Sequence, residues 1–147
     1  MSRFVRMTGV CLAAALAMGA CSAGSKTSSA ERAVIAKADD LCLTAQDKVG
    51  PKLGDDPAAD RDAIKTASDG MMAIKAPTQN LNAWTLFVES VNNLWISLDD
   101  KAQALLPEVN DKARADRAQA TITSVNANVK KYATNYHMHE CVRGFGR

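Results

Sequence analysis

Apolar side chains recur every three or four positions along most of the chain, which is the period of an amphipathic α-helix. The clearest segment lies between Thr78 and Pro107, where the steps alternate between three and four. Its apolar positions are Leu81, Trp84, Val88, Val91, Trp95, Leu98, Ala102 and Leu105, with Phe87 and Leu94 widening the face. Such a repeat is typical of helices that pack at shallow angles in a bundle. This stretch predicts one long helix that Thr78 caps and Pro107 ends.

Three further segments carry the same period. The first stripe is Ile35, Ala38, Cys42, Ala45 and Val49. The second stripe is Ile64, Ala67, Met71 and Ile74. A last stripe, in a segment that begins near residue 111, is Ala118, Ile122, Val125, Val129, Tyr132 and Tyr136. Ser28 or Ser29 is expected to cap the first helix, Asp56 with Pro57 behind it is a typical start for the second, and Pro77 stops the second.

These four segments predict an all-α domain, residues 30–147, in which antiparallel helices with short connections form a four-helix bundle-like fold. We find no convincing alternation of apolar and polar residues that would predict a strand. About 118 residues is the size of one domain and is enough to enclose a core. In an up-down-up-down arrangement the first and fourth helices are neighbours.

The chain opens with a different pattern, a continuous apolar run from Gly9 to Ala20 that follows Arg3 and Arg6. This run is too short for a transmembrane helix, which needs roughly 20 apolar residues. It matches the apolar part of a signal peptide, preceded by positive charge and followed by small residues. We therefore expect residues 1–20 to be a signal peptide that is absent from the mature protein.

The end of the apolar run, LAMGAC at Leu16–Cys21, resembles the lipobox of bacterial lipoproteins. The resemblance implies that Cys21 receives a diacylglycerol thioether and becomes the first residue of the mature chain. Two alternatives stay open. One is ordinary cleavage at the A-x-A site of residues 15–17, which gives a secreted protein, and the other is a cytosolic protein with an apolar N-terminus. Residues 21–29 are rich in Ser and Gly and have the composition of a flexible tether.

The cysteine count fits a lipid anchor. Of the four cysteines, Cys11 lies in the signal peptide and Cys21 would carry the lipid. The remaining pair, Cys42 and Cys141, is expected to form one disulfide in an oxidising compartment. It would close 141 − 42 = 99 residues, and such a bridge contributes about 2–4 kcal/mol to stability. Because Cys42 lies on the inward stripe of the first helix, the bridge would fasten the C-terminal residues to that helix.

The charge balance excludes one class of partner. The chain has 18 basic and 16 acidic residues, but Arg3 and Arg6 leave with the signal peptide. The mature chain then has 18 − 2 = 16 basic residues against 16 acidic ones, and no net charge. A nucleic-acid-binding protein is expected to keep a basic surplus. We therefore expect no nucleic-acid partner.

The stretch NYHMHEC, residues 135–141, holds both histidines and is a candidate for a metal or haem site. Residues two apart on a helix do not face the same way, so His137 and His139 could share an ion only where the helix has ended. His139 also continues the stripe of Tyr132 and Tyr136, which favours a partly buried residue at a helix end. We expect no metal and no cofactor, and keep these four side chains as candidate ligand-binding residues.

Few other residues could support chemistry. Trp84 and Trp95 could line a ligand pocket between helices, although tryptophans on such a stripe more often belong to the core. The acid pairs at 55–56 and 99–100 are expected as helix caps or solvated side chains. The sequence contains no Gly-rich phosphate loop and no G-x-S-x-G motif. We therefore expect no catalytic residues and no enzyme, since a hydrolase would need an unrecognised carboxylate pair.

The lipobox, the Ser/Gly tether, the ADDLC of residues 38–42 and the terminal HEC of residues 139–141 together resemble the small lipoproteins of actinobacteria. That resemblance lends no catalytic residues. With an anchor, a disulfide-fastened core and no catalytic set, we expect a lipoprotein on the outer face of the cytoplasmic membrane that binds an envelope protein or component. The alternative is an extracytoplasmic carrier of a small ligand, metal or haem.

Overall fold

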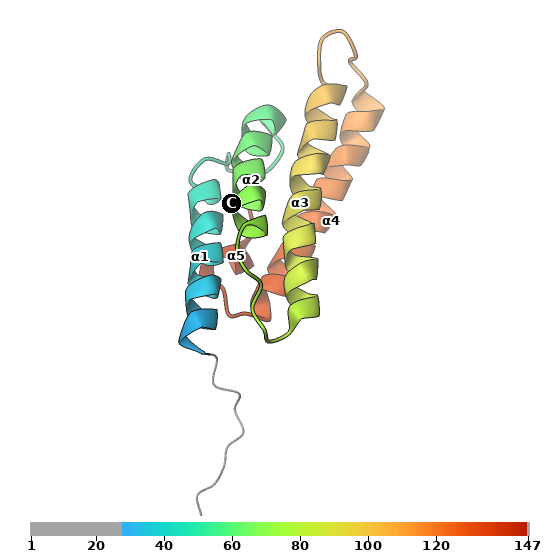
Figure 1. Cartoon of the computed structure of the whole chain (residues 1–147). Helices are drawn as coiled ribbons and strands as arrows, with labels where there is room; N and C mark the ends of the chain where they lie inside the picture. Colours follow the sequence, from blue (N-terminus) through green and yellow to red (C-terminus); the bar gives the residue numbers. More distant parts are fainter. Residues whose placement is uncertain (1–27, 147) are drawn as a thin grey trace, which may run out of the picture.

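The computed structural model describes residues 28–146, and these form five α-helices (Figure 1). Four helices occupy the segments that the apolar pattern predicts, and the fifth is a short helix near the C-terminus. Their bounds are α1 Ser29–Gln46, α2 Pro57–Met72, α3 Leu81–Ala104, α4 Lys112–Thr134 and α5 His139–Arg143. The described residues contain no strand. The predicted all-α fold is confirmed.

Short polar side chains start three of the four long helices. The Ser28 hydroxyl accepts a hydrogen bond from the Glu31 N–H, and the Glu31 carboxylate accepts one from the Ser28 N–H, which makes a capping box. Asp56 caps α2 and Asp111 caps α4 in the same way, each by accepting a hydrogen bond from a backbone N–H of the first turn. Of the last two residues of the predicted tether, Ser28 therefore caps α1 and Ser29 is its first residue.

The start of α3 differs from the prediction. The residue before α3 is Asn80, whose φ of 54° is left-handed and whose side chain makes no capping hydrogen bond. The Thr78 hydroxyl, the predicted cap, instead donates to Oε1 of Glu31 at 2.6 Å. The prediction was wrong because Thr78 is engaged by another helix: it ties the turn before α3 to the start of α1.

The core lies where α3 meets its neighbours. The large apolar side chains of α3 that are fully buried are Phe87, Val91, Leu94 and Leu98. Ile64 and Met71 of α2 and Ile122 and Val129 of α4 pack with them in one cluster. Burial of such a side chain contributes about 1.5–3 kcal/mol. Leu81 and Leu105 end the predicted stripe but are exposed, since each lies at an end of α3.

Successive long helices run antiparallel, as Figure 1 shows. α3 packs against α2 and α4, and α1 packs against α2. α5 packs against both α1 and α4, whereas the backbones of α1 and α4 do not come close to each other. The predicted pairing of the first and fourth helices is therefore replaced by an arrangement in which α5 joins them. The hairpin of α3 and α4 projects beyond α1 and α2 at one end (Figure 1).

Candidate functional site

The stretch NYHMHEC leaves α4 and begins a new helix, so the prediction that it continues α4 is wrong. α4 ends at Thr134, and His137 then adopts a left-handed φ of 53°. This turn brings the Met138 side chain into the core. His139 is the first residue of α5 and is exposed, which also corrects the prediction of a partly buried histidine at a helix end.

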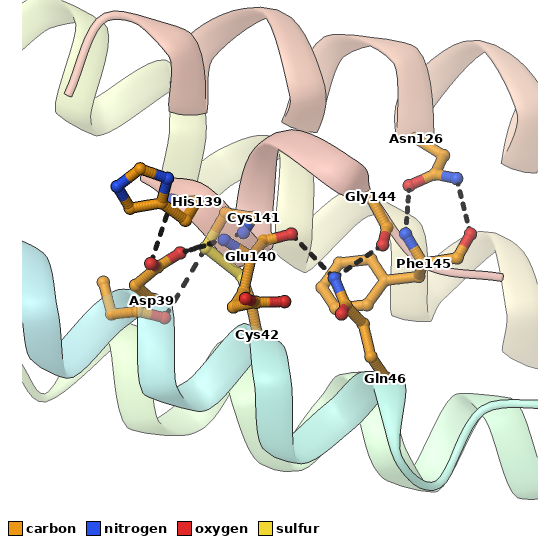
Figure 2. Close-up of a disulfide and its surroundings, with 10 residues drawn as sticks. Asp39, Cys42, Gln46, Asn126, His139, Glu140, Cys141, Gly144 and Phe145 are labelled. Carbon is orange, nitrogen blue, oxygen red and sulfur yellow. Dashed lines mark hydrogen bonds between the residues drawn. A yellow bond between two sulfur atoms is a disulfide. The ribbon is translucent and has the colours of Figure 1, made fainter. Parts of the chain in front are cut away.

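A carboxylate of α1 holds the start of α5 (Figure 2). Asp39 Oδ2 accepts a hydrogen bond from the His139 N–H at 2.9 Å. Asp39 Oδ1 accepts two more, from the N–H groups of Glu140 and Cys141 at 2.8 and 3.0 Å. The first N–H groups of a helix have no partner within that helix, and negative charge is favourable at this end. Asp39 therefore caps α5 from a neighbouring helix.

The other end of α5 is also held by side chains of the long helices (Figure 2). Gln46 Nε2 of α1 donates to the carbonyl oxygens of Glu140 and Gly144 at 2.7 and 2.8 Å. Gly144 has a φ of 71°, and a Cβ at this position would collide with a lysine of α4, so the turn requires glycine. Asn126 of α4 accepts from the Phe145 N–H at 3.1 Å and donates to the Phe145 carbonyl at 2.8 Å.

Cys42 and Cys141 form the predicted disulfide, which joins α1 to α5 with their Cα atoms 5.2 Å apart. Both cysteines are fully buried. Asp39, Cys42 and Gln46 are spaced by three and four residues, so they share one face of α1. This face attaches α5 by a cap, a covalent bond and an amide clamp.

A buried carboxylate joins the start of α1 to the turn before α3. Glu31 is 6% exposed, and its Oε1 accepts hydrogen bonds from the Thr78 hydroxyl at 2.6 Å and the Gln79 N–H at 3.1 Å. The hydrogen bond from Thr78 is the largest cause that lowers the pKa of Glu31 from 4.5 to about 2. Close by, the Tyr136 hydroxyl donates to the carbonyl oxygen of Asn80 at 2.6 Å. The starts of α1 and α3 and the end of α4 therefore meet here.

The two candidate tryptophans lie in different environments. Trp84 belongs to the core, with its ring centroid 5.8 Å from that of Phe87 and 5.7 Å from that of Tyr136. Trp95 is partly exposed, and Lys65 Nζ lies 5.7 Å from its ring centroid. Trp84 and Tyr136 are both ligand-binding candidates, and the structure brings them into contact. They meet as part of the core.

An open groove of about 570 Å³ lies between α1 and the turn that follows α4. Its lining residues are Arg32, Ile35, Ala36, Asp39, Tyr136, His137 and His139. Three ligand-binding candidates, Tyr136, His137 and His139, thus line the groove. Tyr132 lies outside it, and Lys131 Nζ is 5.5 Å from the centroid of the Tyr132 ring. Within residues 28–146 no three His, Cys, Asp or Glu side chains are grouped to hold a metal ion.

The acid pair at 99–100 connects helices. Arg61 of α2 donates to Asp99 Oδ1 at 3.1 Å, and Arg114 of α4 forms an ion pair with Asp100. Each carboxylate is thus engaged by a separate arginine, and the pair fastens α2 and α4 to α3. This role explains the two acids without a catalytic function.

Large apolar side chains are exposed at both ends of the domain. We call Leu105, Leu106 and Val109 the apical tip; they lie in the connection between α3 and α4 and are 47%, 43% and 46% exposed. At the opposite end Leu81, the first residue of α3, is 53% exposed, and Met72, the last residue of α2, is 55% exposed beside the middle of the domain. A group of exposed apolar side chains such as the apical tip is typical of a surface that contacts another molecule.

Cys21, the predicted signal peptide of residues 1–20 and most of the tether lie outside the described residues, so these remain predictions. Between residues 28 and 146 there is no helix with the length and apolar character needed to cross a bilayer. No protein-family model, curated protein or solved structure matches the chain.

Proposed function

We propose that this protein is a lipid-anchored, non-catalytic binding module on the outer face of the cytoplasmic membrane, and that it captures an envelope protein through the apical tip. The observation that carries the proposal is the exposure of Leu105, Leu106 and Val109 at the end of a helical hairpin. Binding that buries such side chains is favourable by roughly 25 cal/mol for each Å² of apolar surface removed from water.

The hairpin that carries the tip is well braced. α3 has 24 residues, which corresponds to about 36 Å at 1.5 Å per residue. The pairs of Arg61 with Asp99 and of Arg114 with Asp100 lie near the tip and fix α2 and α4 to α3. A surface that is ordered before binding loses less conformational entropy when a partner docks. This bracing supports a role in recognition.

The anchor rests on the resemblance of LAMGAC to a lipobox. Seven residues lead from Cys21 to Ser28, and such a length spans at most about 25 Å. The apical tip lies at the end of the domain away from the start of α1 (Figure 1). An anchored domain would therefore present the tip away from the headgroups. Cys21→Ala is expected to move the protein from the membrane fraction to the soluble fraction, and retention in the membrane would count against the anchor.

The capture of a partner is tested by photo-crosslinking. A photoreactive amino acid at position 106 is expected to link an identified envelope protein in cells, and the purified partner should bind the purified protein. Leu106→Asp combined with Val109→Asp should abolish binding. Ile96→Asp is the matched control, since Ile96 is 46% exposed on α3 away from the tip. An absence of any crosslinked envelope protein, or equal loss of binding in the control, would refute a role for the tip.

The groove at Tyr136, His137 and His139 supports a second candidate function, a carrier of a small ligand. The volume of the groove falls within the range of small-molecule sites. The groove is open, however, whereas such sites usually enclose most of the ligand. Native mass spectrometry of protein extracted gently from its own membranes is the test. A small molecule that stays bound would make the carrier function the leading one, and a mass that contains only protein and anchor would dismiss it.

A further inference from the structure

We propose that the end of the domain next to the start of α1 docks on an anionic lipid bilayer. We call this end the basal surface, and its exposed residues are Arg32, Lys75, Leu81 and Lys131. Its orientation in the cell rests on the lipid anchor of the proposed function. The docking contact itself is a property of the folded domain, and can be measured without that anchor.

The elements that carry the basal surface converge at one end. Glu31, next in sequence to Arg32, binds the Thr78 hydroxyl in the connection between α2 and α3. The Tyr136 hydroxyl, just after α4, donates to Asn80 at the start of α3. Figure 1 shows the start of α1, the start of α3 and the end of α4 together at the lower end of the domain. Arg32, Lys75, Leu81 and Lys131, which these elements carry, are all exposed.

Charge distinguishes this end from the other. The basal segments are residues 28–36, 73–82 and 131–138. They carry three basic side chains, Arg32, Lys75 and Lys131, against one acid, Glu31, which is buried under hydrogen bonds. The opposite end, residues 50–62 and 99–117, carries six basic side chains against nine acids. Because anionic headgroups attract lysine and arginine near the surface, they favour the basal end and repel the apical end.

Leu81 adds apolar contact to this charge. It is 53% exposed, among the highest values for large apolar side chains of residues 28–146, and it is the first residue of α3 at this end. Lysine and arginine bury their carbon chains against apolar surroundings while the charged groups stay in water. Interfacial binding of proteins depends on this combination of apolar area and basic charge. The apical tip has similar apolar side chains but an acidic setting, so it does not fit the same surface.

The chain outside the described residues ends in the right place for docking. The seven residue steps from the predicted lipid on Cys21 to Ser28 would keep the start of α1 within about 25 Å of the headgroups. The apical tip lies about 36 Å further along α3. The basal surface is thus the end that the anchor brings to the bilayer, and docking would direct the tip outward.

The experiment uses the chain from residue 21 onward with Cys21→Ser, which carries no lipid. Residues 28–146 contain the whole core cluster and the disulfide, so this form retains the fold. It is sedimented with vesicles of phosphatidylcholine alone and with vesicles that also contain phosphatidylglycerol, at low and high salt. The basal variant is Lys75→Gln with Lys131→Gln, and the matched apical control is Lys112→Gln with Arg117→Gln. Circular dichroism confirms that each variant is folded.

We expect binding to vesicles that contain phosphatidylglycerol, weaker binding at high salt, and none to phosphatidylcholine alone. Each basal lysine should contribute about fivefold, so the basal variant should bind about 25-fold more weakly, whereas the control should change less than about twofold. Equal binding to both kinds of vesicle, equal loss in the control, or no binding at low salt would overturn the proposal. None of these results depends on Cys21 or on the apical tip, so failure here is distinct from failure of the proposed function.

Discussion

Replacing Asp39 by alanine is expected to destabilise the domain much more than replacing its neighbour Asp40. Both are acidic residues of α1, and only Asp39 caps α5. Its carboxylate accepts three backbone hydrogen bonds, from the N–H groups of residues 139–141. Asp40 is exposed. The pair of variants therefore separates the effect of the cap from the effect of removing one negative charge from α1.

The magnitude follows from the geometry. Loss of a capping side chain costs about 0.5–2 kcal/mol, and a hydrogen bond to a charged group contributes about 1.5–3 kcal/mol. The three hydrogen bonds are not additive, because Asp39 is partly exposed and water can reach the freed N–H groups. We expect Asp39→Ala to lower the free energy of unfolding by about 2 kcal/mol and Asp40→Ala by less than about 0.5 kcal/mol. Asp39→Asn keeps one acceptor oxygen and should cost about 1 kcal/mol.

Two measurements test this expectation. Urea unfolding with the disulfide intact gives the free energies, and the dependence on urea should stay the same in all variants. Amide hydrogen exchange reports on α5 itself, because a loss of about 2 kcal/mol should speed exchange at Glu140 and Cys141 about 30-fold. If Asp39→Ala and Asp40→Ala unfold at the same urea concentration, or if these two amides keep their protection, the cap does not stabilise α5 and the reasoning fails.

Three further outcomes are expected. Cys42→Ala with Cys141→Ala should lower the free energy of unfolding by about 2–4 kcal/mol in urea, because it opens a long loop; a loss below about 1 kcal/mol would mean that the hydrogen bonds to α5 suffice. Stability should hold above pH 4.5 and decline as the pH falls toward 2, because the Glu31 pKa of about 2 in the folded state lies below its ordinary 4.5. Glu31→Gln should make Tm fall less steeply over this pH range, and an unchanged fall in Tm would contradict the expectation. Ser68→Ala should raise the free energy of unfolding by about 1 kcal/mol, since the buried Ser68 Oγ has no hydrogen-bond partner within residues 28–146. A lower Tm would refute this expectation, because it would show that the hydroxyl stabilises the fold.

The four long helices could be predicted because each carries its own apolar stripe and local start and stop signals. α5 could not be predicted, since five residues are too few to show a helical period. Its stabilising contacts are also distant in sequence: the hydrogen bond between the His139 N–H and Asp39 spans 100 positions. The same distance explains why α4 was expected to continue through residues 135–139, where the stripe still fitted a helix.

Part of the site could be read from the sequence and part could not. The cysteine count predicted the pair Cys42 and Cys141, since no other cysteines were left to pair. Asp39 and Gln46 were missed, although their spacing from Cys42 places them on the same face of α1. Asn126 gave no local signal, because its partner is the backbone of Phe145 and not a side chain. Side chains that bind distant backbone are the part of a fold that a single sequence reveals least.

The position of α5 gives the disulfide a role in the proposed function. α1 follows the predicted tether and contacts only α2 and α5 among the helices, whereas the apical tip belongs to the hairpin of α3 and α4. α5 is fastened to α1 by Cys42 and Asp39, and to α4 through Asn126. Without these bonds the hairpin would be joined to the tethered helix only through α2 and through the hydrogen bonds of Glu31 to the turn before α3. The disulfide thus helps to fix the direction of the apical tip relative to α1 and the predicted tether, and a binding module that must face away from its membrane depends on that direction.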